Sequence, residues 1–204
     1  MDIDVIIEPS VTPAELAEIA VTAEKMGVRA LWASNYHSNW DPFVSLVPAA
    51  MATSKIILGA LAVCPWEMHP LKMANALLSL NEVAKGRAMI AVGGGGALIG
   101  ALGWRARAGG PIWPGKHPVK GNRMPDRRVL GVREALEILN LARSGEVCMG
   151  YEAGIVDVTR PFQMNWAPPD GPLFYSCSSR PMMIRMGGQY ADGLQLSDYT
   201  PDMM

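Results

Sequence analysis

Apolar residues along the chain alternate between short continuous runs and longer stretches with helical spacing. Continuous runs such as Ala-Met-Ile-Ala-Val at residues 88–92 are typical of parallel strands covered on both faces. The runs begin about 25 to 32 residues apart in the first half of the chain, which is the length of a strand–helix unit. The pattern predicts six strands: Ile3–Ile7, Arg29–Ala33, Ile56–Val63, Ala88–Val92, Leu173–Ser176 and Leu194–Ser197.

Helices with readable ends are predicted between these strands. Thr12-Pro-Ala-Glu15 is a capping box with proline at the first helical position, and Gly27 ends that helix. Asp41-Pro42 begins a second helix, and Pro70 begins a third that ends near Gly86. Alternating strands and helices predict an α/β fold with a parallel sheet. The pattern alone leaves a (β/α)8 barrel and a doubly wound open sheet as equal alternatives.

Composition limits the class of protein. The chain has 204 residues, half of them hydrophobic, and a net charge of -1, so one domain with a real core is expected. This balance argues against disorder and against nucleic-acid binding. Cys64, Cys148 and Cys177 form no C-x-x-C pair, which argues against a disulfide scaffold or a metal site. With an acidic start where a signal peptide would be basic, a cytoplasmic protein is expected.

Four consecutive glycines, Gly93–Gly96, follow the fourth predicted strand. A membrane span over Ala88–Trp104 is disfavoured, because six of those 17 residues are glycine. A dinucleotide-binding G-x-G-x-x-G would need glycine at Leu98 or Ile99, and neither position has it. The remaining explanation is a strand end whose bare backbone a flat ligand approaches closely.

A long irregular segment, residues 103–128, comes directly after the glycines. It carries one acid, Asp126, and seven bases: Arg105, Arg107, Lys116, Lys120, Arg123, Arg127 and Arg128. Loops this long in compact domains are usually functional or disordered. The segment is therefore either a solvated surface loop or a basic lid over an anionic ligand at the carboxyl ends of the strands.

An ordered set of short motifs now adds a family resemblance. The motifs are Leu31–His37, Thr53–Gly59, Leu80–Arg87, Ser144–Glu146, Ser178–Met183 and Ala191–Gly193. With them the chain resembles the luciferase-like flavin and deazaflavin oxidoreductases, which are (β/α)8 barrels. Within that superfamily it is most similar to the methylenetetrahydromethanopterin reductases.

The resemblance implies an oxidoreductase that moves a hydride between coenzyme F420, an 8-hydroxy-5-deazaflavin, and a small organic, pterin-like substrate. Two alternatives stay open: an FMN-dependent monooxygenase and a flavin-binding protein without catalysis. A complete barrel takes roughly 250 residues. The chain is therefore expected to form one domain over residues 1–204, a barrel truncated after six strands. Its open edges favour a homo-oligomer.

The resemblance also implies where a cofactor ring would lie. Gly93, Gly94, Gly95 and Gly96 would form a floor for the ring, because no Cβ intervenes there. Many deazaflavin relatives carry an acid just after this strand, but the matching position here is Gly96.

The end of the second strand carries the predicted catalytic residues. Relatives often have Asp-His at two positions that are Asn35 and Tyr36 here, and the histidine follows one residue later as His37. His37 is a candidate general acid or hydrogen-bond donor, with a surface histidine as the alternative. Trp40 either forms an aromatic wall over the ring or packs in the core.

The third strand ends in Leu61, Ala62, Val63 and Cys64, which the resemblance places behind the ring. It implies a cis peptide bond between Leu61 and Ala62 that forms a bulge. Cys64 could be a nucleophile, but a small buried hydrophobic residue is favoured because the sequence places no base beside it.

A phosphate site is predicted where the fifth strand leads into a helix. The expected contacts are Ser176, Ser178, Ser179 and Arg180. Free backbone N–H groups at a helix N-terminus attract anions, and hydroxyl and guanidinium groups would add to this. The alternative is simple helix capping by Ser179.

Overall fold

A computed structural model describes residues 2–8, 10–103, 127–168 and 171–196. Six parallel strands form one sheet. They are β1 (Asp4–Ile7), β2 (Ala30–Ser34), β3 (Ile57–Val63), β4 (Ala88–Gly93), β5 (Leu173–Cys177) and β6 (Gly193–Gln195). All six predicted strands are present, and their ends differ from the predicted ends by at most two residues.

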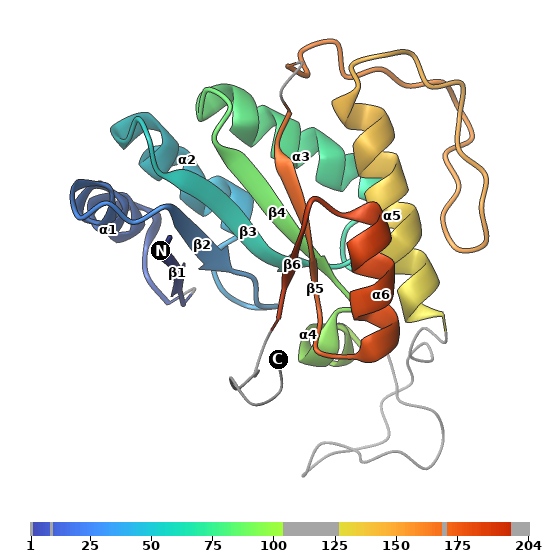
Figure 1. Cartoon of the computed structure of the whole chain (residues 1–204), viewed down its shortest axis with the longest axis horizontal. Helices are drawn as coiled ribbons and strands as arrows, with labels where there is room; N and C mark the ends of the chain where they lie inside the picture. The colour runs from blue at the N-terminus through green and yellow to red at the C-terminus, as the bar shows by residue number, and fades with distance from the viewer. Residues whose placement is uncertain (1, 9, 104–126, 169–170, 197–204) are drawn as a thin grey trace.

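The order of the strands decides between the two predicted architectures. Each strand pairs with the next in sequence, β1-β2-β3-β4-β5-β6, and the sheet curls with its helices around the outer face (Figure 1). A doubly wound sheet reverses its strand order at a switch point, and this sheet does not. The prediction of a truncated barrel is therefore confirmed.

Six helices accompany the strands in the described part of the chain: α1 (Pro13–Lys25), α2 (Pro42–Ala52), α3 (Pro70–Val83), α4 (Gly96–Ala101), α5 (Arg128–Arg143) and α6 (Pro181–Tyr190). The predicted capping box is present, since Thr12 and Glu15 bond to each other's backbone N–H groups. Asp41 caps α2 by accepting from the Val44 N–H at 2.9 Å. None of these helices has both the length and the apolarity that crossing a membrane requires.

The sheet buries residues on both faces. Its outer face packs on the helices through residues such as Leu31, Leu58 and Phe174. On its concave face Trp32 is 2% exposed and lies over Gly59. The Trp32 Nε1 donates to the Asp4 carboxylate at 3.1 Å, and its ring meets Tyr175 edge-on at 5.3 Å. Trp32 and Tyr175 thus pack on the concave face together with smaller side chains such as Ala30 and Ala91.

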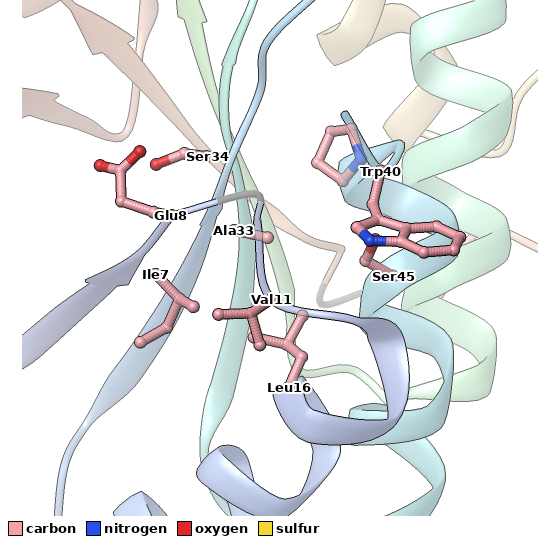
Figure 2. A pocket seen from close by; sticks show the side chains of 9 residues that line it. Ile7, Glu8, Val11, Leu16, Ala33, Ser34, Trp40 and Ser45 are labelled. Atoms are coloured by element: carbon pink, nitrogen blue, oxygen red, sulfur yellow. The ribbon is translucent and has the colours of Figure 1, made fainter. Parts of the chain in front are cut away.

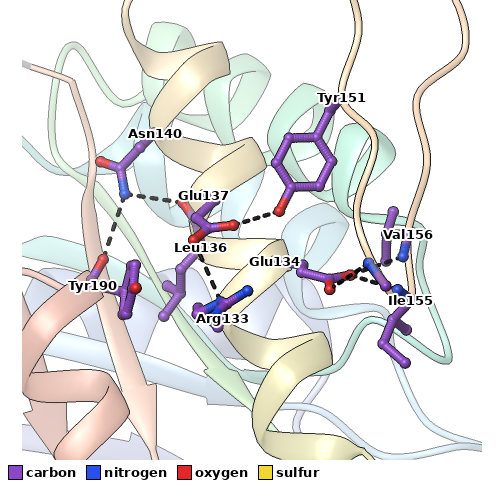
Figure 3. Close-up of polar contacts among 10 residues, drawn as sticks. Arg133, Glu134, Leu136, Glu137, Asn140, Tyr151, Ile155, Val156 and Tyr190 are labelled. Carbon is purple, nitrogen blue, oxygen red and sulfur yellow. Dashed lines mark hydrogen bonds and ion pairs between the residues drawn. The ribbon is translucent and has the colours of Figure 1, made fainter.

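Residues 148–162 extend beside α5 as a ribbon held by two antiparallel bridges. The fully buried Glu134 carboxylate of α5 accepts hydrogen bonds at 2.9 Å from three consecutive backbone N–H groups, at Gly154, Ile155 and Val156 (Figure 3). One turn further along α5, Glu137 accepts from the hydroxyl of Tyr151. Two carboxylates of one helix thus anchor the ribbon.

Candidate functional site

A pocket opens where the chain leaves β2 and β3. Its lining joins side chains from the β2–α2 segment, the β3–α3 segment and α4: Asn35, Tyr36, His37, Asp41, Pro42, Phe43, Val63, Glu67, Met68, Leu98 and Leu102. The three predicted catalytic residues therefore lie together, with the predicted cofactor contact Val63. Tyr36 and His37 are exposed, whereas Asn35 is half-buried.

A bulge in β3 forms one wall of this region. The peptide bond between Leu61 and Ala62 is cis, as predicted, and the pairing with β4 shifts between Leu61 and Val63. Asn35 binds the bulge twice. Its backbone N–H donates to the Leu61 carbonyl at 2.6 Å, and its side-chain Nδ2 donates to the Ala62 carbonyl at 3.1 Å. The end of β2 and the bulge are thus one hydrogen-bonded unit.

Gly93 and Gly94 face opposite sides of the sheet. A Cβ on Gly93 would lie 3.4 Å from the Ala62 Cβ and 3.4 Å from the Cys177 carbonyl, so Gly93 sits between the bulge and β5. A Cβ on Gly94 would instead meet Met183 at 3.4 Å and Arg128 at 3.8 Å. Only the first of these two predicted ring contacts lies beside the bulge.

Gly95 and Gly96 have a conformational reason to be glycine. Their φ angles are +85° and +43°, in the left-handed region, where Gly95 caps the N-terminus of α4. A Cβ on Gly95 would lie 2.4 Å from the Ile99 Cγ2, so the α4 turn itself requires glycine there. Around Gly96 a Cβ would meet no described atom within 4 Å.

Cys64 is fully buried. Burial, with the nearby Glu67 carboxylate, raises the pKa of its thiol to about 12. A thiol with such a pKa stays protonated at neutral pH and is a poor nucleophile. The interpretation of Cys64 as a small buried residue is confirmed.

Trp40 lines a second hollow, next to the first. Its indole lies beside Ser45, across from Glu8 and Ser34 at the ends of β1 and β2 (Figure 2). Because Trp40 is 50% exposed, the core-packing alternative is wrong. Glu8 was not anticipated from the sequence, although an acid directly after a strand is the signal that could have identified it.

The predicted phosphate residues surround the start of α6. The Ser178 hydroxyl accepts from the Arg180 N–H at 3.1 Å, and the Ser178 N–H donates to the Gln195 carbonyl at 3.1 Å. Ser176 is 1% exposed and packs under α6, where a Cβ on Gly187 would lie 2.5 Å from its Cβ. Ser178, Ser179 and Arg180 thus lie together at the helix start, and Ser176 is covered by the helix.

Glu67 is a pocket residue that the sequence alone did not identify. Burial raises the pKa of its carboxyl group, and nearby Asp41 adds to this, while hydrogen bonds from Cys64 and Asn35 lower it; the net shift is upward. A raised pKa in a pocket is typical of a functional acid. The sequence signal was an acid in the short turn between the β3 strand and the proline that begins α3.

Most of the predicted basic lid, residues 104–126, lies outside the described residues, and so do five of its seven bases. Arg127 and Arg128 are described, and the Arg128 side chain lies near Gly94. No group of three His, Cys, Asp or Glu side chains in the described ranges is arranged to hold a metal ion.

Six consecutive parallel strands, outer helices and a pocket at the carboxyl ends of the strands define part of a barrel-type α/β protein. The profile of the luciferase-like monooxygenase family matches residues 2–203. The chain belongs to that family.

Individual relatives agree with this assignment. The chain is 28% identical over 200 residues to the 5,10-methylenetetrahydromethanopterin reductase of Methanopyrus kandleri, covering 95% of this chain and 54% of that protein. The solved coenzyme F420-dependent tetrahydromethanopterin reductase of the same organism superposes with a TM-score of 0.74 at 26% identity, over 96% of this chain and 55% of that one.

A second solved structure is an F420-dependent secondary alcohol dehydrogenase bound to an F420–acetone adduct. It superposes with a TM-score of 0.77 at 19% identity, over 98% of this chain and 59% of that one, and supports the fold. The chain thus spans about half the length of the reductases it resembles.

Proposed function

We propose that the protein is an oxidoreductase that transfers a hydride between coenzyme F420 and a small organic substrate, with a pterin-like compound as the preferred class. The observation that carries this proposal is the β3 bulge between Leu61 and Val63, where the Asn35 side chain is bonded to the Ala62 carbonyl and Gly93 lies beside Ala62 without a Cβ. The sequence relatives that span most of the chain include reductases of methylenetetrahydromethanopterin.

In this proposal the ring lies against the bulge. Gly93 is buried between the bulge and β5, and the absence of a Cβ keeps that side of the bulge flat. When bound, the deazaflavin supplies the ring carbon that gives or accepts the hydride. In this proposal Leu61, Ala62, Val63 and Cys64 back the ring, and Trp40 covers it from the neighbouring hollow.

The remaining predicted residues receive roles in the same proposal. Ser178, Ser179 and Arg180 hold the cofactor phosphate at the start of α6. Asn35, Tyr36 and His37 orient the substrate, and His37 holds the proton that accompanies hydride transfer.

The experiment compares Gly93→Val with the control Gly94→Ala. Valine at 93 projects beside the bulge into the space assigned to the ring, whereas alanine at 94 faces Met183 and Arg128. The measurement is a fluorescence titration with F420 and with FMN at two salt concentrations, after circular dichroism has shown that both variants are folded.

Gly93→Val should weaken F420 binding by about tenfold or more, and Gly94→Ala should bind like the wild type. F420 should bind more tightly than FMN and with a steeper dependence on salt, because its tail is acidic. Equal or reversed affinities would favour the FMN-dependent monooxygenase. Binding without turnover of any second substrate would favour a flavin-binding protein.

We also propose that the protein acts as a homo-oligomer. β1 and β6 are the outer strands of the described sheet, and outer strands expose backbone groups that a second chain can pair with. Analytical ultracentrifugation tests this, and a single monomeric species at micromolar concentration would refute it.

A further inference from the structure

Asn35 and Glu67 form a pair across the pocket wall. The Asn35 Nδ2 donates to the Glu67 Oε1 at 2.9 Å and to the Ala62 carbonyl at 3.1 Å. Two acceptors beside one amide atom identify that atom as the nitrogen, and both of its N–H bonds are used. The amide oxygen is therefore the group that Asn35 has left for a ligand.

The same carboxylate oxygen also holds the β3 end. Glu67 Oε1 accepts from the Cys64 N–H at 2.6 Å, and the Glu67 N–H donates back to the Cys64 carbonyl at 3.2 Å. Glu67 thus closes the turn that follows the bulge while it grips Asn35 at the end of β2. This carboxylate thus adds a further link between the end of β2 and the turn after β3.

We propose that Glu67 is a positioning residue: it orients the Asn35 amide so that the Oδ1 accepts a hydrogen bond from an N–H or O–H group of the bound ring or substrate. This inference rests on the proposed function and names the ligand group that the β2 end recognises.

The pair joins one neutral amide to one carboxyl group, and this difference in charge gives a sharp test. Aspartate at position 35 would set a carboxylate against Glu67, with Asp41 as a further acid nearby. Glutamine at position 67 removes this repulsion. A glutamine oxygen in place of Glu67 Oε1 can still accept from the Cys64 N–H, but it offers no donor to the carboxylate introduced at position 35, and the Ala62 carbonyl also loses its donor. Glutamine at position 67 should therefore relieve the charge repulsion and recover only part of the loss.

The experiment uses four variants: Glu67→Gln, Glu67→Ala, Asn35→Asp, and Asn35→Asp combined with Glu67→Gln. F420 affinity is measured by fluorescence titration, and the melting temperature of the unliganded chain by circular dichroism. Glu67→Gln keeps both acceptor contacts and should weaken binding by about threefold at most. Glu67→Ala and Asn35→Asp should each weaken it by about tenfold to a hundredfold, and the double variant should recover the part of the loss that comes from charge repulsion.

Two results would overturn the inference: Glu67→Gln as weak as Glu67→Ala, or a double variant no better than Asn35→Asp alone. The melting temperatures separate this inference from the proposed function. If the wild type binds neither F420 nor FMN, the proposed function fails. The coupling between Asn35 and Glu67 is then tested by the melting temperatures alone: Glu67→Gln should restore part of the stability lost in Asn35→Asp. If the stability changes of the two single variants simply add in the double variant, the coupling is refuted.

Discussion

Replacement of Gly59 by alanine should destabilise the protein strongly, because this glycine lies directly under Trp32. A Cβ on Gly59 would be 2.2 Å from the Trp32 Cε3 and 2.6 Å from its Cζ3. The indole cannot easily move away, since it is 2% exposed, bonded to Asp4 and packed against Tyr175. We expect a cost of about 2–3 kcal/mol, which corresponds to a fall in melting temperature of about 4–12 °C.

The matched control is Gly188→Ala in α6, where a Cβ would meet no described atom within 4 Å. Alanine is the better helix former, so this control should melt at or slightly above the wild-type temperature. Thermal unfolding followed by circular dichroism and by tryptophan fluorescence measures both variants. If Gly59→Ala melts like the control, the indole is not held on the concave face, and the packing described for that face is wrong.

Three further predictions concern single side chains. Burial raises the pKa of Glu24, but hydrogen bonds from Ile56, Lys55 and Ser54 outweigh this effect and lower the pKa to about 2. Its contribution to stability is therefore present above the unfolded pKa of about 4.3 and lost as the pH falls toward 2. Glu24→Gln should lower the melting temperature at pH 7 and have little effect near pH 2, and an equal loss at both would contradict this. Glu134→Ala leaves three backbone N–H groups without an acceptor and should lower the free energy of unfolding by about 2–3 kcal/mol. Limited proteolysis should then cut the 148–162 ribbon first. An uncut ribbon would count against its anchoring by Glu134. Iodoacetamide at pH 8 should label Cys148 and spare Cys64, as mass spectrometry of peptides can show; early labelling of Cys64 would contradict its burial.

The repeating elements were predictable because their signals are local. Continuous apolar runs marked the strands, and the caps at Thr12 and Asp41 marked the helix starts that the structure contains. The strand order was not predictable from periodicity, because barrel and open sheet share the same strand–helix rhythm. The family resemblance supplied the barrel and the cis bond at Leu61–Ala62.

Parts of the site depend on contacts that no local pattern records. Glu67 becomes a pocket residue only because the turn after the bulge brings it to Asn35, 32 positions away in the sequence. The four glycines looked alike in the sequence, yet the structure separates them by the direction of the absent Cβ and by the sign of φ. Gly95 is fixed by the short helix α4, which apolar spacing did not predict.

Among the described residues, two carboxylates lie on either side of the β2 end. Gly96 occupies the position where the family resemblance implied an acid. Glu8 follows β1 and lines the hollow of Trp40, whereas Glu67 follows β3 and bonds to Asn35. Because β2 pairs with β1 on one side and with β3 on the other, the two acids flank its carboxyl end. Carboxylates and hydrogen-bond acceptors thus gather where Asn35, Tyr36 and His37 leave the sheet, and under the proposed function this arrangement suits a ligand that offers N–H or O–H groups.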